Sequence, residues 1–161
     1  MRNTLLCAIL FCFLPALNGQ TTDAVAVQVA TTTLNAAQLA SLHGSPILLV
    51  AAPGAGKALA PFSAIFQLKA GTSPYTVAPD SHVLLYVGQT FNNVTRANAT
   101  RFLDQTSSQI FMAEGIGGIG ISPQSTLDNA PLMVENDSST EWTGGDGTVT
   151  ITVYYTVVSL Q

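Results

Sequence analysis

Charged side chains are scarce in this chain. Only 9% of its 161 residues are Asp, Glu, Lys or Arg, against roughly a quarter in a typical soluble domain. With five Lys and Arg residues and a formal net charge of -4, no basic stripe is available to displace counterions from phosphates. Nucleic-acid binding is therefore disfavoured, and so is attachment to an anionic membrane surface, which needs clustered positive charge. The low charge also removes a barrier to self-association.

Cysteine is almost absent, and both Cys7 and Cys12 lie in one apolar run near the start of the chain. A basic start precedes this run, Pro15 breaks it and small residues follow, which is typical of a secretory signal peptide. The run is shorter than the roughly 20 residues that a membrane-spanning helix needs. We therefore expect residues 1–19 to be a cleaved leader and residues 20–161 to form a domain without disulfides or membrane attachment. An uncleaved buried strand and a mis-assigned start codon are the alternatives.

Helix-favouring Lys and Glu are also rare, whereas Val and Thr recur at every second position. This alternation predicts strands, because successive side chains of a strand point to opposite faces. It begins at Val25, continues through the threonines at 31–33, and is longest at 148–160. A strand of that length needs partners on both sides, so we expect it to lie centrally in a sheet. The side chains that share its apolar face are Val149, Ile151, Val153, Tyr155 and Val157.

Several shorter strands follow from the same rules. The apolar run 47–52 has the length of a buried strand, and every second side chain from Phe62 to Leu68 is predicted to face the same way. Turns rich in Gly and Pro separate these segments. The other predicted strands are 75–77, 82–87, 109–113 and 132–135.

One short helix is predicted near residues 36–42. Asn35 and Gln38 have the spacing of a capping box, in which each side chain bonds the backbone of the other residue, and Gly44 ends the helix. About eight strands with almost no helix indicate an all-β fold. We therefore expect a single-domain antiparallel β-sandwich or a jelly-roll-like arrangement.

Two glycine-rich segments resemble nucleotide-binding motifs without meeting their requirements. Residues 51–58 look like a phosphate-binding loop, but Ala51 and Ala58 replace the first glycine and the magnesium-binding hydroxyl. A strand pattern also follows Lys57, where that loop requires a helix. Residues 115–120 match Gly-x-Gly-x-x-Gly, but a proline follows closely where the helix should begin. We therefore expect a β-turn with a solvated Lys57 at the first segment, a flexible or bulged apolar connection at the second, and no cofactor.

The sequence contains no evident catalytic arrangement. Asp80, Ser81 and His82 are sequence neighbours, so in a strand their side chains alternate between faces and cannot form a triad. His43 and His82 lack the spacing of paired metal ligands, and the sequence has no Gly-x-Ser-x-Gly elbow. We interpret His43 as a helix-end cap and His82 as a strand-edge residue, and we expect no enzymatic activity.

Two groups of residues remain as candidate sites. Oxygen-rich acidic loops can bind calcium, but the spacing here matches no known calcium loop, and a solvated hairpin at 144–147 is the favoured alternative. Aromatic side chains at a surface can stack on sugars, although core packing is the favoured role for Trp142. The weak calcium candidates are Glu135, Asp137, Glu141 and Asp146, and the candidate stacking residues are Trp142, Tyr154 and Tyr75.

Three sequons, at Asn93, Asn98 and Asn136, are acceptors for N-glycosylation in a host that performs this chemistry. The first two lie in the stretch 89–108, where the hydrophobic periodicity is weak. We therefore predict that all three asparagines lie in polar, exposed loops.

Several pieces of the chain resemble one group of proteins. The pieces are Ala37-Gln38-Leu39-Ala40-Ser41-Leu42, Pro46-Ile47-Leu48-Leu49-Val50, Ala52-Pro53-Gly54-Ala55-Gly56-Lys57, Pro74-Tyr75-Thr76, Leu84-Leu85-Tyr86-Val87-Gly88, Thr143-Gly144-Gly145-Asp146-Gly147-Thr148 and Val153-Tyr154-Tyr155. They are similar to segments of uncharacterised small β-rich proteins of tailed bacteriophages, which are generally taken to be virion structural components. The resemblance spans residues 34–158 and rests on turn and strand signatures. It implies a virion structural or decoration role.

These observations favour a non-enzymatic structural or binding module located in a virion or outside the cell. The first hypothesis is a virion structural or decoration protein that packs through its sandwich surface, against its own copies as a homo-oligomer or against other virion proteins. The alternative is a secreted adhesin or carbohydrate-binding sandwich, which the predicted leader favours. A third hypothesis is an enzyme whose site is assembled from Ser, Asp and His residues far apart in the sequence.

Overall fold

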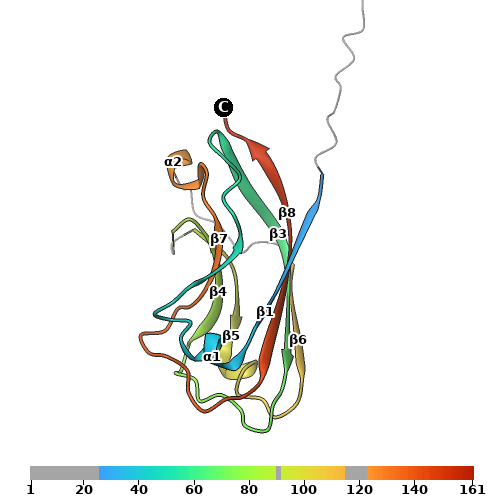
Figure 1. Ribbon diagram of the computed structural model, residues 1–161, viewed down its shortest axis with the longest axis vertical. Coiled ribbons are helices and arrows are strands. Elements are labelled where there is room, and N and C mark those ends of the chain that lie inside the picture. Colours follow the sequence, from blue (N-terminus) through green and yellow to red (C-terminus); the bar gives the residue numbers. More distant parts are fainter. Residues whose placement is uncertain (1–25, 90–91, 115–122) are drawn as a thin grey trace, which may run out of the picture.

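The computed structural model describes residues 26–89, 92–114 and 123–161, and within them the chain forms two facing sheets (Figure 1). Each sheet has four strands, and all pairs are antiparallel. This arrangement confirms the predicted all-β fold and the antiparallel sandwich. The predicted leader at 1–19 and the glycine-rich segment 115–120 lie outside the described residues.

The first sheet has the strand order β1-β8-β3-β6. Its strands are β1 (Gln28–Leu34), β8 (Thr148–Ser159), β3 (Lys57–Lys69) and β6 (Gln109–Glu114). Strand β8 lies between β1 and β3, which confirms its predicted central position. On its outer face the threonines bond to those of β1: the Oγ1 atoms of Thr31 and Thr152 are 3.1 Å apart, and those of Thr33 and Thr150 are 2.9 Å apart.

The second sheet has the strand order β2-β7-β4-β5. Its strands are β2 (Ile47–Val50), β7 (Leu132–Asn136), β4 (His82–Val87) and β5 (Asn93–Asn98). Strand β4 ends as predicted at Gly88, which has a φ of 70° that disfavours any side chain. Strand β2 was expected to be buried, but Leu48 is 51% exposed. The reason is that β2 is an edge strand with β7 as its one partner.

Asn93 and Asn98 were predicted to lie in an irregular, exposed loop, and both lie in strand β5 instead, although Asn93 is exposed as predicted. The buried side chains of this strand, Val94 and Ala97, are three positions apart rather than two. The spacing arises because the register with β4 shifts between Leu85 and Tyr86, which leaves one extra residue in β5. A strand interrupted in this way has no period-two pattern, so the sequence carried no clear signal for it.

A β-bulge also explains the one error in the predicted face of β3. The register with β8 shifts between Pro61 and Ser63, so Phe62 is the extra residue. One inserted residue exchanges the two faces of a strand. Leu59 before the bulge and Phe66 after it are therefore both buried, whereas Phe62 is 42% exposed.

Helix α1 (Ala36–Ala40) has the predicted capping box. Gln38 N donates to Asn35 Oδ1 at 2.9 Å, and Asn35 N donates to Gln38 Oε1 at 3.0 Å. The helix is two residues shorter than predicted, and Leu39 anchors it in the core. Two further short helices were not predicted, η1 (Ala99–Arg101) and α2 (Gln124–Leu127).

The core lies between the two sheets and is closed by the helices and loops. Phe66 packs edge-on against Phe102, with ring centroids 6.4 Å apart. Aromatic pairs favour this geometry because ring edges and faces carry opposite partial charge. The largest fully buried side chains are Trp142, Phe66, Leu34, Leu39, Leu42, Leu85, Leu103, Leu132, Ile151, Val83, Val134 and Val149.

Candidate functional site

The segment that resembles a phosphate-binding loop is a closed turn. Gly54 and Gly56 have φ values of 100° and 73°, and Lys57 begins strand β3 rather than a helix. The backbone amides that would face a phosphate are bonded within the protein: Gly54 N donates to Asn129 Oδ1 at 2.9 Å, and Gly56 N donates to Asp128 Oδ1 at 2.7 Å. The turn predicted from the sequence is therefore confirmed.

Ser81 and His82 have different partners, and Ser81 lies before β4 rather than in it, because the strand begins at His82. Ser81 is buried, donates to the carbonyl of Ala78 at 2.8 Å, and accepts from Nε1 of Trp142 at 3.2 Å. His82 begins β4, and its Nδ1 lies 2.9 Å from Oδ2 of Asp137. A histidine and a carboxylate are thus paired. The hydroxyl of the neighbouring serine bonds instead to the carbonyl of Ala78 and to the indole of Trp142.

The four acidic calcium candidates do not converge. Asp137 also accepts from His82 N at 2.7 Å. Glu141 accepts from His43 N at 2.9 Å and from Gly44 N at 2.7 Å. In the part of the chain that the structure describes, no three His, Cys, Asp or Glu side chains are grouped to hold a metal ion. Asp137 and Glu141 therefore each accept hydrogen bonds from backbone N–H groups, at different places in the fold.

Asp146 accepts three hydrogen bonds from the loop that follows β3. It accepts from Oγ1 of Thr72 at 2.6 Å, from Ser73 N at 2.9 Å and from Thr72 N at 3.1 Å. These bonds favour the ionised carboxylate and lower the pKa of Asp146. The hairpin predicted at 144–147 is not formed, because β7 and β8 belong to different sheets. Residues 144–147 instead connect the two sheets, and Asp146 ties this connection to the loop after β3.

Two of the three candidate stacking residues are buried. Trp142 is fully buried, and Tyr75 is buried with its hydroxyl donating to the carbonyl of Gly147 at 2.7 Å. Burial, together with the charge of Asp146, raises the pKa of Tyr75 to about 12. Neither ring can lie against a sugar in this fold. Tyr154 is half-buried on the outer face of β8 and is the one candidate that reaches solvent.

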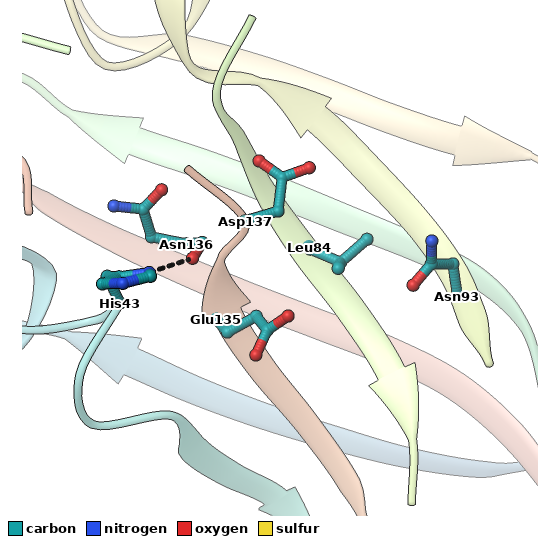
Figure 2. A pocket seen from close by; sticks show the side chains of 6 residues that line it. All are labelled: His43, Leu84, Asn93, Glu135, Asn136 and Asp137. Atoms are coloured by element: carbon teal, nitrogen blue, oxygen red, sulfur yellow. Dashed lines mark hydrogen bonds between the residues drawn. The ribbon is translucent and has the colours of Figure 1, made fainter. Parts of the chain in front are cut away.

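A hollow of about 400 Å³ lies against the second sheet (Figure 2). Strands β7, β4 and β5 and the loop after α1 supply its walls. Nδ1 of His43 lies 3.3 Å from the carbonyl of Asn136. The residues that line the hollow are His43, Leu84, Asn93, Glu135, Asn136 and Asp137. Sequence reasoning treated these residues separately, because they come from four distant segments.

Asn136 was expected to lie in an exposed loop, and the structure corrects this. It ends β7, its side chain is buried, and Nδ2 donates to the carbonyl of Thr140 at 2.8 Å. Oδ1 accepts from Ser138 N at 2.9 Å. An amide held in this way is inaccessible for glycan attachment in the folded protein.

Glu135 is the electrostatically unfavourable group of the hollow. Burial raises the pKa of Glu135, the nearby charge of Asp137 raises it further, and His43 lowers it in part. A raised carboxyl pKa means that the folded protein holds the proton more tightly than the unfolded chain does. The ionised form therefore costs stability as the pH rises through 4.5, the ordinary pKa of this group.

We expect the Glu135→Gln variant to unfold at a higher temperature than the unaltered protein at about pH 7, and at nearly the same temperature at about pH 3. Thermal unfolding followed by circular dichroism across this range measures the difference. Glu141→Gln is the matched control and should lower the unfolding temperature, because its carboxylate accepts two backbone N–H bonds. A Glu135→Gln variant that is less stable at neutral pH would contradict the assignment.

A second surface, at the β6 edge of the first sheet, is apolar. We define the β6 edge as residues 109–113. Ile110 and Met112, on the outer face, are 60% and 62% exposed, and Phe111, on the inner face, is 37% exposed. Three consecutive apolar residues in a strand make both of its faces apolar, a signal in the sequence that had only indicated a short strand.

The outer face beside this edge carries little charge. The pairing registers place Thr31, Thr152, Ile65 and Met112 in one row across the sheet, and Thr33, Thr150, Gln67 and Ile110 in the next. A crevice of about 280 Å³ lies beneath the edge, between β6 and the segment that contains β5 and η1. Its lining is mixed: besides apolar side chains it contains one charged residue, Arg101, and two amides. The lining residues are Ala97, Asn98, Arg101, Phe102, Gln109, Ile110 and Phe111.

Comparison with known proteins identifies no family. No protein-family model matches the chain, and no curated protein sequence matches it significantly. Among solved structures, a chain of the cyanophage Pam1 capsid asymmetric unit is similar with a TM-score of 0.44 and 13% sequence identity, over 89% of this chain and 99% of that one. A score at this level does not establish a shared fold. Among the described residues, no helix is long and apolar enough to cross a membrane.

Proposed function

We propose that this chain is a non-enzymatic structural protein of a phage particle, which acts by packing its β-sandwich against other protein subunits. The observation that carries the proposal is the β6 edge, where Ile110, Phe111 and Met112 are all exposed. The resemblance to tailed-phage proteins supports the same role. The predicted leader at 1–19 is a separate proposal, tested by mass analysis of the N-terminus of the purified protein.

The physical argument starts from how monomeric proteins treat sheet edges. An edge strand presents unpaired N–H and C=O groups, and monomers usually protect it with lysine, proline or an inward-pointing charge. Residues 109–113 contain none of these, and the one charged residue of β6 is Glu114, at its end. Exposed apolar side chains that are grouped on an unprotected edge indicate a contact surface. A subunit of an assembly buries such a surface, whereas an isolated monomer would aggregate through it.

The test is the mass and the location of the native protein. The full chain has a mass of 16.8 kDa, and light scattering after gel filtration should give a defined multiple of the chain mass that mass spectrometry measures for the same purified protein. Mass spectrometry of particles purified from a producing culture should also detect the chain at constant stoichiometry. A protein that is monomeric at all concentrations and absent from particles would contradict the proposal.

A second candidate function is binding of a hydroxyl-rich ligand such as a glycan. The hollow around His43, Asn93 and Glu135 favours it, because carboxylate, amide and imidazole groups can all bond to sugar hydroxyls. The buried Trp142 and Tyr75 count against it, because they cannot serve as stacking platforms. Retention on a glycan array that is lost in an Asn93→Ala variant would favour this candidate, and absence of binding across a broad array would count against it.

A further inference from the structure

We propose that two copies of this chain join through strand β6, which pairs antiparallel with β6 of the second copy around a two-fold axis at Phe111. The first sheets of the two copies then form one continuous sheet. This inference rests on the proposed function and names the partner as a second copy of the chain. It also specifies the register of the contact.

The outer edge of β6 is available for such a contact. Within the described residues, β6 pairs with β3 alone. The backbone of residues 109–113 therefore presents its alternate N–H and C=O groups away from the sheet. An added strand bonds to these groups whatever its sequence, so the side chains decide which strand fits.

Symmetry restricts the register. Residues that lie opposite each other in an antiparallel pair point to the same face of the sheet. A two-fold axis at Phe111 places Ile110 opposite Met112 of the second copy, and this pair occurs twice. Phe111 lies opposite its own counterpart, and Gln109 lies opposite Ala113. The two most exposed apolar side chains of the edge thus cover each other.

Neighbouring registers match less well. An axis at Met112 would place Ile110 opposite Glu114, an apolar residue against a carboxylic acid. An axis at Ile110 would place Met112 opposite Ser108, which lies before β6 begins. The register centred on Phe111 is therefore the one that pairs apolar residues throughout the centre of the strand.

Charge favours a second copy over a charged partner. The chain has a formal net charge of -4, so two copies repel each other unless they meet through uncharged segments. Residues 109–113 carry no charge, and the adjoining rows on β3 contribute Ile65 and Gln67. A basic or an acidic partner would find no opposite charge in these rows.

The crevice beneath the edge suits the same geometry. Phe111 lies on the inner face, with its ring centroid 5.8 Å from that of Phe66. Phe111 of the second copy would point to the same face from directly across the pair. It would therefore lie over the crevice of about 280 Å³ that Phe102 and Ala97 help to line.

Cysteine cross-linking tests the register. In the full chain with Cys7→Ser and Cys12→Ser, a mixture of Ile110→Cys and Met112→Cys variants should form a disulfide-linked dimer under mild oxidation. Each variant alone should cross-link far less, because diagonal neighbours are about 7–8 Å apart, too far for a disulfide without backbone movement. Equal cross-linking in the mixture and in the single variants would overturn the register.

Arginine substitutions separate this inference from the proposed function. Ile110→Arg with Met112→Arg should raise the dimer dissociation constant by at least about 100-fold, because like charges would face each other across the pair. The control is Thr31→Arg with Thr33→Arg on β1, the opposite edge of the same sheet, which should leave the dimer intact. If both pairs abolish assembly, β6 binds β1 of the next copy and the two-fold contact is wrong.

If neither pair affects an assembly that does form, the contact lies elsewhere and the inference fails while the structural role stands. If the unaltered chain is found in particles but never self-associates, the partner is another particle protein and the inference fails alone. Absence from particles together with a monomeric state contradicts both. Circular dichroism of each variant confirms that the sandwich remains folded.

Discussion

The Trp142→Ala variant is expected to lose about 3–5 kcal/mol of unfolding free energy, the range for removing a large aromatic side chain from a core. Trp142 is fully buried, and its indole Nε1 donates to Ser81 Oγ at 3.2 Å. The substitution leaves a cavity and removes a bonding partner from a buried hydroxyl. Because a domain has a total stability of about 5–15 kcal/mol, much of the protein should be unfolded or close to unfolding.

Urea denaturation followed by intrinsic tyrosine fluorescence and circular dichroism measures this loss. Trp142→Phe should cost less, because a ring still fills the core while the indole N–H is lost. Tyr154→Ala is the control for an aromatic residue at the surface and should cost the least, since Tyr154 is half-buried on the outer face of β8. Equal losses for Trp142→Ala and Tyr154→Ala would show that Trp142 is not a core residue.

The Gly145→Ala variant is expected to lose about 3 kcal/mol, the upper end of the usual cost of overpacking. A Cβ at this position would overlap Cγ and both Cδ atoms of the Tyr75 ring. The ring cannot easily withdraw, because Tyr75 is buried and its hydroxyl donates to the carbonyl of Gly147 at 2.7 Å. To remove this overlap, residues 144–147 would have to move, although Asp146 ties them to the loop after β3.

Gly44→Ala is the matched control. The nearest atom to its added Cβ is Oε1 of Glu141 at 3.1 Å, which needs to shift by only a few tenths of an ångström. We expect this variant to change the unfolding temperature little, whereas Gly145→Ala should lower it clearly. Similar unfolding temperatures for the two variants would mean that the Tyr75 ring is not held against Gly145.

The elements that were predictable are those whose signal is local. Strand β8 alternates without a break from Thr148 to Tyr155, and the Asn35–Gln38 capping box involves residues three positions apart. The closed turn before Lys57 followed from glycines that tolerate positive φ. In each case the physical cause lies within a few residues, so the sequence contains it.

The errors arose where a distant strand decided the outcome. Phe62 faces solvent because the pairing of β3 with β8 leaves it as the extra residue of a bulge. Strand β5 was not predicted because its pairing with β4 contains a similar bulge. The core position favoured for Trp142 is confirmed, whereas Tyr75, a candidate stacking residue, is buried for a related reason. Burial is a property of what lies opposite a side chain, and a single segment does not specify it.

The candidate sites show the same limit. The pairing of His82 with Asp137 joins residues 55 positions apart, and Glu141 bonds to the loop at His43 from 98 positions away. No spacing rule links such residues. The β6 edge was visible as three consecutive apolar residues, but their meaning depended on β6 being the last strand of its sheet.

The amino-acid sequence by itself therefore determined the fold class, the long central strand, the capped helix and the scarcity of charge. These properties follow from alternation, local hydrogen bonding and composition. Only the tertiary structure decided which aromatic residues are buried, which carboxylates brace loops, and which apolar strand is left at an edge. Those outcomes depend on sheet order and register, which are set by contacts between segments far apart in the chain.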